Sequence, residues 1–377
     1  MNIYEKALKQ SKFYIKKNIL KYNSLRNFDF GANQRDNVSC LSSFFCHKVL
    51  LEYNMINEIL KIHPYSKVEK YIQEIFWRVY WKGWLEHRPQ VWNDFIDADP
   101  DFIEDDYNRA INGNTGIVCF DDWVKELKNE NYLHNHTRMW FASIWIFTLN
   151  LPWQLGAKFF MKYLLDGDAA SNTLSWRWVA GIQTQGKNYI ARESNIRKFT
   201  NQRYMNTSLK ENALPLNEEK FYPLCDIRQL HTDQKNKNIV LFESDLHINN
   251  RISFFEKYEN VYLLLLDNKN RVVELDEKVL FFKKKLQESF IQKIPNAQFL
   301  NDDDLQKLNE SYDVIYPGVG ENIDFLKREI TDMNKLHFIG LKEDIFCWQY
   351  SKKGFFNFKK NIPEIINYLF HEGEFFK

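Results

Sequence analysis

The sequence predicts an α-helical domain followed by a smaller α/β domain with a mainly parallel sheet. Apolar residues recur at helical spacing through residues 1–210, whereas short apolar runs separated by helical segments fill residues 237–377. The intervening residues 211–236 are polar and proline-bearing, as a linker is. A chain of 377 residues is long for one hydrophobic core, which also favours two domains. Ten of the 11 tryptophans precede residue 180, so the two parts differ in composition.

Four segments of the first part are predicted helices because of their apolar spacing: Leu50–Leu60, Lys67–Glu86, Asp121–Asn129 and Thr137–Asn150. Pro152 ends the last of them, since proline breaks a helix interior. The longest apolar run, Met139–Leu149, is about half as long as a bilayer-spanning helix. It therefore predicts a buried core helix, and we expect no membrane partner.

The second part carries four short apolar runs that are predicted strands: Asn238–Phe242, Val261–Leu266, Asp313–Tyr316 and Leu336–Ile339. Helical segments near Glu274–Ile291 and Ile323–Met333 separate them. This alternation predicts a Rossmann-like sheet of parallel strands. The turn Tyr316–Gly320 (YPGVG) is either a nucleotide-binding loop or a simple reversal of the chain.

Charge and cysteine content restrict the partners and the location. Residues 1–210 carry 28 basic and 22 acidic side chains, whereas residues 211–377 carry 23 and 28. The positive excess of the first part is compatible with a polyanionic partner. The five cysteines include no CxxC pair, which favours a cytoplasmic location and argues against a cysteine-held metal.

The segment Leu164–Gly181 (LLDGDAASNTLSWRWVAG) combines two aspartates, an asparagine and two tryptophans. Asp166 and Asp168 are either caps of the following helix or metal ligands, but no histidine lies nearby, so we expect no metal. Asp168, Asn172 and Trp176 follow one another at intervals of four and share one helical face. A helical face that carries a carboxylate, an amide and an indole indicates a binding site for a polar aromatic ligand and not a face packed into the core.

A series of motif residues extends on both sides of this segment: Thr115-Gly116, Asp121, Leu127, His134-Asn135, Arg138-Met139, Ala142-Ser143, Trp153, Gly156, Phe160, Asp166-Gly167-Asp168, Ala170, Asn172, Trp176 and Trp178. Upstream stand Tyr22, Arg26, Ser39, Leu41, Ser42 and Glu74-Ile75-Phe76-Trp77-Arg78. In this order and spacing, residues 20–205 resemble the flavin-binding helical domain of the photolyase and cryptochrome family.

The resemblance implies that the helical domain binds FAD and that the protein repairs pyrimidine dimers in DNA. In this reaction, that of a deoxyribodipyrimidine photo-lyase, the light-excited reduced flavin transfers an electron to the dimer. The alternatives are a cryptochrome-like blue-light photoreceptor and a flavin-binding protein without repair activity. The implied partner is damaged DNA, and we expect a monomer. The lesion type and any antenna pigment stay open.

The resemblance also implies roles for individual residues. The FAD-binding residues are Tyr22, Ser39, Leu41, Ser42, Glu74, Arg78, Asn135, Arg138, Asp166, Asp168 and Asn172. The pocket for a flipped-out dimer, where catalysis occurs, consists of Glu74, Trp77, Asn135, Met139 and Trp178. Trp176 and Trp153 form an electron relay, while Arg26 and His136 contact DNA. Arg138 and Asp166 are expected to form an ion pair beside the flavin ring, and Asn172 to face its N5.

Three features depart from the family pattern. Ala110 stands where relatives have the outermost relay tryptophan, so the relay lacks its solvent end unless another aromatic such as Tyr107 replaces it. His136 and Tyr132 stand where many relatives have arginine and tryptophan. The family's α/β domain precedes the flavin domain, whereas here it follows, and Val240–His247 resembles the family's first strand. We therefore expect a permuted domain order.

Overall fold

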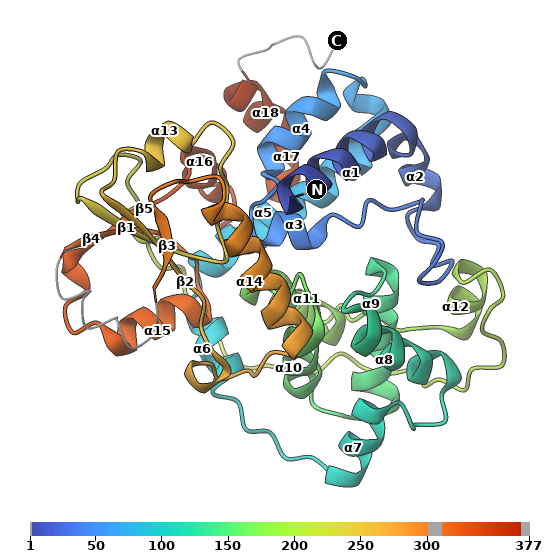
Figure 1. Cartoon of the computed structure of the whole chain (residues 1–377). Coiled ribbons are helices and arrows are strands. Elements are labelled where there is room, and N and C mark those ends of the chain that lie inside the picture. The colour runs from blue at the N-terminus through green and yellow to red at the C-terminus, as the bar shows by residue number, and fades with distance from the viewer. Residues whose placement is uncertain (1, 301–310, 371–377) are drawn as a thin grey trace.

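The first part of the chain is helical in the computed structural model, which describes residues 2–300 and 311–370 (Figure 1). Its α-helices are α1 (Ile3–Lys17), α2 (Tyr22–Leu25), α3 (Ser42–Cys46), α4 (Glu52–Leu60), α5 (Tyr65–Glu86), α6 (Gln90–Ile96), α7 (Glu104–Asn112), α8 (Val118–Glu130), α9 (Asn135–Ser143), α10 (Trp153–Tyr163), α11 (Ala169–Ala180) and α12 (Glu193–Phe199). The 3₁₀ turn η1 (Ile19–Lys21) connects α1 to α2. The four predicted helices are confirmed as α4, α5, α8 and α9, with shifted ends.

Helix α9 continues into a π-helical turn, η2 (Ile144–Thr148). Together, α9 and η2 cover most of the predicted helix Thr137–Asn150. The backbone N–H of Leu149 donates to the carbonyl of Ile144, 2.9 Å away, which is the i→i−5 bond of a π turn. Pro152 then serves as the N-cap of α10. The sequence therefore identified the break correctly, but not the wider turn that precedes it.

The second part contains a five-stranded sheet in the order β3-β2-β1-β4-β5, with every neighbouring pair parallel. The strands are β1 (Asn238–Phe242), β2 (Asn260–Leu264), β3 (Ala297–Phe299), β4 (Tyr312–Ile315) and β5 (Leu336–Ile339). The helices and 3₁₀ turns are α13 (Ile252–Phe255), η3 (Asn268–Asn270), α14 (Glu277–Ile291), α15 (Glu321–Glu329), η5 (Met333–Lys335), α16 (Lys342–Trp348), α17 (Phe355–Lys360) and α18 (Ile362–Phe370). The predicted parallel sheet is confirmed, but strand β3 was not predicted.

The central strand β1 packs apolar side chains on both faces of the sheet. Ile239 and Leu241 join the core that also contains residues of α14 and of the helical part. Val240 and Phe242 join a separate core with α15. Burial on both faces explains why the strands are continuous apolar runs and not alternating patterns. In Figure 1, α14 lies between the sheet and the helical part.

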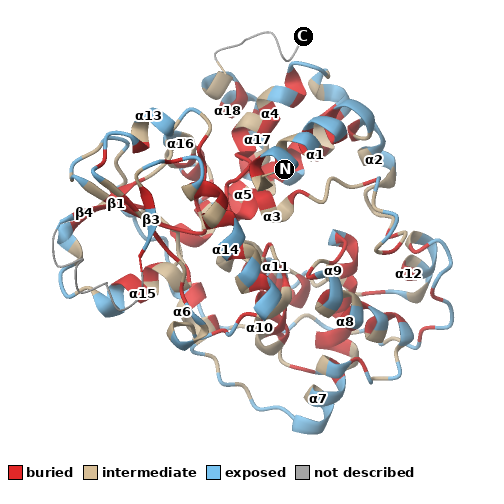
Figure 2. Ribbon diagram, viewed as in Figure 1, coloured by how far each residue is buried: buried red, intermediate tan, exposed pale blue. Residues whose placement is uncertain are grey.

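The two parts of the chain share one hydrophobic core. Helices α16 and α17, which follow the sheet, pack against α5 of the helical part. Figure 2 shows buried residues continuing from the strands into α5, with exposed faces outside. Residues 211–236 contain no helix or strand, in agreement with the predicted linker. The domain limits at 210 and 237 stay a prediction.

Residues 211–236 make an ion pair and a hydrogen bond with the helical part. Glu218 pairs with Arg177 of α11, and the hydroxyl of Tyr222 donates to Asp94 of α6 at 2.8 Å. All five cysteines are unpaired. Among the described residues, none of the helices combines the length and apolar character that crossing a bilayer demands. A cytoplasmic location stays a prediction.

Candidate flavin and lesion site

A cavity of about 460 Å³ opens among α5, α9, α11 and the segment that leads into α3. Its volume falls within the range of roughly 300–1,000 Å³ that is typical of ligand pockets. Fourteen of the predicted site residues line it: Tyr22, Ser39, Leu41, Ser42, Glu74, Trp77, Arg78, Asn135, Arg138, Met139, Asp166, Asn172, Trp176 and Trp178. The fold therefore gathers in one cavity most of the residues that the sequence singled out from separate segments. We call it the larger cavity.

The floor of the larger cavity is buried and partly polar. Leu41, Asp166, Asn172 and Trp176 are all at most 7% exposed. The amide Nδ2 of Asn172, a lining residue, donates to the backbone carbonyl of Ala157 at 2.9 Å, and Oδ1 is the acceptor of the same amide. A polar group on such a floor can bind a ligand atom that carries a proton.

The expected ion pair between Arg138 and Asp166 is present, with Nη1 and Oδ2 3.0 Å apart. Burial alone would raise the pKa of Asp166, but the guanidinium groups of Arg138 and Arg78 outweigh it and hold that pKa below its usual value. The carboxylate is therefore ionised at neutral pH. It places a fixed negative charge, neutralised by Arg138, beside the cavity.

Several buried polar atoms of the cavity lining have no hydrogen-bond partner within the described parts of the chain. Among them are two donors, the indole N–H of Trp176 and the hydroxyl of Ser171. A buried donor without a partner costs about 1–3 kcal/mol, so such atoms are uncommon in a native protein without a ligand or water. Their presence here fits a cavity that holds a large polar cofactor.

The rim of the larger cavity carries the residues predicted to hold the lesion. Glu74 and Asn135 are exposed, while Trp77, Met139 and Trp178 are half-buried. The indole of Trp178 stacks on Tyr189, with ring centroids 5.9 Å apart. The predicted lesion residues thus lie at the opening, and two of them, Glu74 and Asn135, are also predicted cofactor residues.

Asp168 lies outside the lining of the larger cavity, unlike the other predicted cofactor residues. Its Oδ1 accepts from the backbone N–H of Ser171 at 2.7 Å, as the N-cap of α11. Its Oδ2 pairs with Arg78 at 2.8 Å. The capping interpretation of Asp168 is therefore confirmed, and its two oxygens are occupied by protein groups.

The two predicted DNA contacts differ in exposure. His136 is 8% exposed, and its ring stacks on Trp140 with centroids 4.2 Å apart. Its Nδ1 bonds to the carbonyl of Asn27 at 2.9 Å and its Nε2 to the hydroxyl of Tyr189 at 3.2 Å. Both ring nitrogens are thus occupied, which argues against the predicted contact. Arg26 is half-buried and donates to Asn23 in its own turn.

The aromatic contacts of Trp176 lead toward Tyr107 by a path that the sequence did not reveal. The rings of Trp176 and Trp145 meet edge to face at 6.2 Å, and those of Trp145 and Tyr107 at 6.0 Å. Tyr107 is half-buried, so this path approaches the surface. Trp153 stacks on Phe95 at 5.5 Å, and Ala110 is fully buried.

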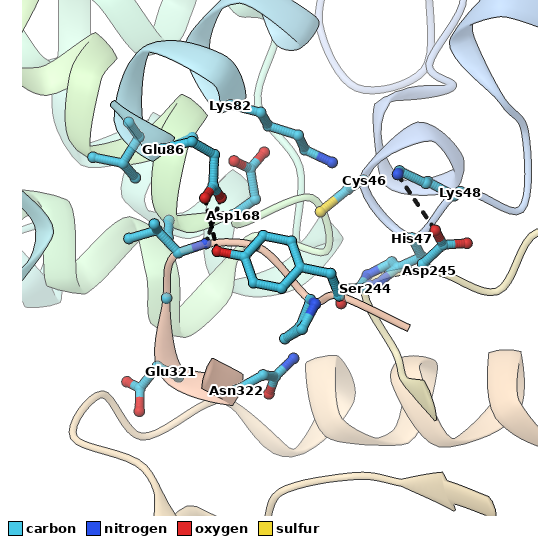
Figure 3. Close-up of a pocket in the computed structure, with 18 of the residues that line it drawn as sticks. Cys46, His47, Lys48, Lys82, Glu86, Asp168, Ser244, Asp245, Glu321 and Asn322 are labelled. Carbon is cyan, nitrogen blue, oxygen red and sulfur yellow. Dashed lines mark hydrogen bonds and ion pairs between the residues drawn. The ribbon is translucent and has the colours of Figure 1, made fainter. Parts of the chain in front are cut away.

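A smaller cavity of about 110 Å³ lies at the carboxyl ends of β1, β4 and β5, against α5 (Figure 3). Glu86 of α5 accepts there from the hydroxyl of Tyr316 at 2.7 Å and from the backbone N–H of Val319 at 2.8 Å. Burial raises the pKa of Glu86 to about 7. The predicted turn Tyr316–Gly320 therefore binds the helical part of this same chain. Gly167 lines both cavities.

Several lining residues escaped the sequence analysis. Trp81 lies one helical turn after Trp77, with ring centroids 5.0 Å apart, and this i, i+4 spacing was a usable signal. Tyr71 precedes both on α5. No local pattern marked Ser175, because a lone exposed serine carries no periodic signal.

Comparison with known proteins identifies the helical part. Residues 71–209 match the family model described as the FAD binding domain of DNA photolyase. Over these residues the helical part is similar to the FAD-binding domain of photolyases. FAD is the cofactor of this domain type, as its description states.

Among curated relatives of this photolyase-type domain is the deoxyribodipyrimidine photo-lyase of Buchnera aphidicola, 30% identical over 200 residues, or 50% of this chain and 40% of the relative. The Agrobacterium fabrum photo-lyase is 34% identical over 124 residues, or 31% of this chain and 25% of the relative. A class III photolyase structure from Agrobacterium tumefaciens matches with 25% identity and a TM-score of 0.46, covering 52% of this chain and 42% of that one. This chain thus spans less than half the length of these relatives.

Proposed function

We propose that the protein repairs pyrimidine dimers in DNA by a light-driven, FAD-dependent reaction. The observation that carries this proposal is the larger cavity, where a buried polar floor meets an open aromatic rim. A floor alone would suit any flavoprotein. The rim adds two indoles, Trp77 and Trp178, together with the exposed polar groups of Glu74 and Asn135, at the place where a base would enter.

The floor residues hold and orient the cofactor. The hydroxyls of Ser39 and Ser42 are suited to the diphosphate, and Arg138 with Asp166 is suited to the polar edge of the flavin ring. Because Nδ2 of Asn172 is bonded to Ala157, Oδ1 would be the atom that accepts a hydrogen bond from a protonated ring nitrogen of bound FAD, which would favour the reduced ring. FAD supplies the electron that light transfers to the dimer.

The rim residues hold a dimer that has left the duplex. Flipping costs a few kcal/mol, and least for damaged bases, whose pairing is already weakened. Stacking on an aromatic side chain offsets that cost by about 1–3 kcal/mol per base. Trp77 and Trp178 provide such faces, Met139 adds an adaptable apolar contact, and Glu74 and Asn135 offer hydrogen bonds to the base edges.

The arrangement of the chain supports a permuted domain order. The sheet follows the helical part, and its central strand β1 begins two residues before Val240–His247, which resembles the family's first strand. We also propose that the protein acts as a cytoplasmic monomer on damaged DNA, with the domain limits given above. The positive excess of residues 1–210 is consistent with that partner.

The decisive test is repair of an oligonucleotide that carries one cyclobutane dimer, with FAD-loaded full-length protein, in light and in darkness. We expect repair in light only. Trp77→Ala should lower the affinity for the damaged strand about tenfold or more, because a stacking face is lost. Trp84→Ala is the matched control, since Trp84 lies on the same helix, packs on Arg88 and does not line the larger cavity.

Two outcomes would overturn the proposal in favour of its alternatives. Bound FAD with a light-induced change in conformation but no repair would identify a photoreceptor. Bound FAD without any light response would identify a flavin-binding protein. Equal repair by wild type and Trp77→Ala would leave the reaction intact but refute the assigned pocket.

A further inference from the structure

His231 extends the sheet by one residue beyond its edge strand. Its backbone N–H donates to the carbonyl of Phe338 at 2.9 Å, and its carbonyl accepts from the N–H of Gly340 at 2.8 Å. His231 and Ile339 therefore form an isolated parallel bridge. The final part of the connecting segment 211–236 is thus attached to β5.

This pairing brings two histidines together that are far apart in the sequence. Directly opposed residues of a parallel pair point to the same face, and residues two apart on one strand also share a face. His231, opposite Ile339, therefore lies on the face of His337. Their rings stack with centroids 4.1 Å apart and an angle of 26°.

Asp233 completes a cluster with these two histidines. The chain bends after His231, and Nε2 of His337 bonds to the backbone carbonyl of Asp233 at 3.1 Å. One ligand atom from each of His231, Asp233 and His337 lies within 4.8 Å of the other two. The two histidines are half-buried and Asp233 is exposed, so all three side chains are accessible from solvent.

We propose that His231, Asp233 and His337 bind a zinc ion. Two imidazole nitrogens and a carboxylate oxygen are a donor set that zinc accepts, and water completes a tetrahedral shell. Zinc ligands at about 2.0–2.2 Å from the ion lie about 3.3 Å from one another. The three atoms must therefore approach one another by up to about 1.5 Å, which side-chain rotation at an accessible site allows. Magnesium and calcium are disfavoured, because they prefer oxygen ligands.

The ion would add a link between two segments that are already joined by the His231–Ile339 bridge, the stacked imidazoles and the bond from His337 to the carbonyl of Asp233. His231 and Asp233 belong to the connecting segment, whereas His337 belongs to β5, which leads directly into α16. An ion that binds only the folded arrangement stabilises it by mass action. This site is distinct from both cavities, because none of its residues lines either one. The sequence analysis expected no metal because it weighed only neighbouring residues.

The test is a zinc titration of metal-stripped, FAD-loaded full-length protein against a chromophoric competitor. We expect one bound zinc ion per chain in the wild type, and its loss in His231→Ala and in His337→Ala. Asp233→Asn should weaken binding at least tenfold. Asp226→Asn is the matched control, because Asp226 is an exposed aspartate of the same segment. Cys225→Ser should also retain the ion, which excludes chelation by the exposed thiol.

Thermal unfolding gives a second readout that separates binding from misfolding. Zinc should raise the Tm of the wild type and of Asp226→Asn, but leave that of His231→Ala and His337→Ala unchanged. The FAD content of every variant reports whether it has folded. Equal zinc binding by the wild type and the folded His231→Ala/His337→Ala double variant, or no binding by the wild type, would overturn the proposal.

Discussion

The phenyl ring of Phe355 stacks on the indole of Trp77, with ring centroids 3.6 Å apart and planes inclined by 13°. Trp77 lines the larger cavity, whereas Phe355, at the start of α17, does not. The side chain that holds this indole in place therefore comes from the far end of the chain. Phe355 lies outside residues 71–209, the segment that matches the photolyase family model.

The first prediction is that Phe355→Ala weakens the preference for damaged over undamaged duplex by about threefold to tenfold. An aromatic pair contributes about 0.5–1.5 kcal/mol beyond its buried area, and without it the indole of Trp77 is less well positioned. Competition binding at constant salt measures the preference, because salt alone changes affinity for DNA.

Phe356→Ala is the control, because Phe356 is the adjacent residue and is 78% exposed. A double-mutant cycle separates positioning from general destabilisation: in a Trp77→Ala background, Phe355→Ala should cause no further loss of preference. An equal loss in both backgrounds would contradict a role through Trp77.

The elements that sequence analysis predicted best are those with local signals. Strand β5 was predicted with its observed ends, because Lys335 precedes its apolar run and Gly340 follows it. Strand β3 was missed, because it has three residues of which two are exposed, so no apolar run marks it. The parallel order could be inferred from the alternation of strands and helices alone.

The site was predictable where the chain matches a motif, and not where distant segments meet. The resemblance to the photolyase and cryptochrome family implied an ion pair between Asp166 and Arg138, and this ion pair is present. Phe355 could not be found in this way, because its contact with Trp77 depends on how α17 packs on α5. The buried setting of His136 could not be predicted for the same reason, since only the fold reveals that its ring stacks on Trp140.

The second prediction concerns pH and Glu86. Its folded pKa of about 7 lies above the ordinary 4.5, because burial outweighs the hydrogen bonds from Tyr316 and Val319. The folded state therefore binds more protons than the unfolded state between these values, and the free energy of unfolding falls as pH rises through that window. Well above pH 7, this group lowers the free energy of unfolding by about 3 kcal/mol relative to acidic pH.

Glu86→Gln should remove this pH dependence, because the amide cannot ionise and still bonds to both partners. Urea unfolding at pH 4.5 and pH 7.5 measures it: the drop in stability between the two pH values should be smaller in the variant than in the wild type. Glu58→Gln, at an exposed position, should leave the drop unchanged. The same drop in Glu86→Gln as in the wild type would refute the assignment.

The third prediction is that Gly156→Ala lowers the free energy of unfolding by about 1–3 kcal/mol, as overpacking of a core does. A Cβ at this position would lie 2.3 Å from the indole of Trp176 and 3.0 Å from that of Trp145. Both indoles are almost completely buried. Gly354→Ala is the control, because nothing lies within 4 Å of its added Cβ and its φ of −62° suits alanine.

The last prediction concerns photoreduction of FAD by external thiols, for which the ring contacts favour Trp176, Trp145 and Tyr107 over Trp153. Phenylalanine preserves packing but resists oxidation, so Trp145→Phe should slow photoreduction most and Tyr107→Phe should slow it clearly. Trp153→Phe should slow it less, because the Arg177 guanidinium lies 5.9 Å from the centre of that indole and disfavours electron loss there.

Restoring the family's tryptophan by Ala110→Trp is no useful test, because Ala110 is fully buried and the larger ring would overpack the core. If Trp153→Phe abolishes photoreduction while Trp145→Phe leaves its rate unchanged, electrons leave through Trp153 and the path through Tyr107 is wrong.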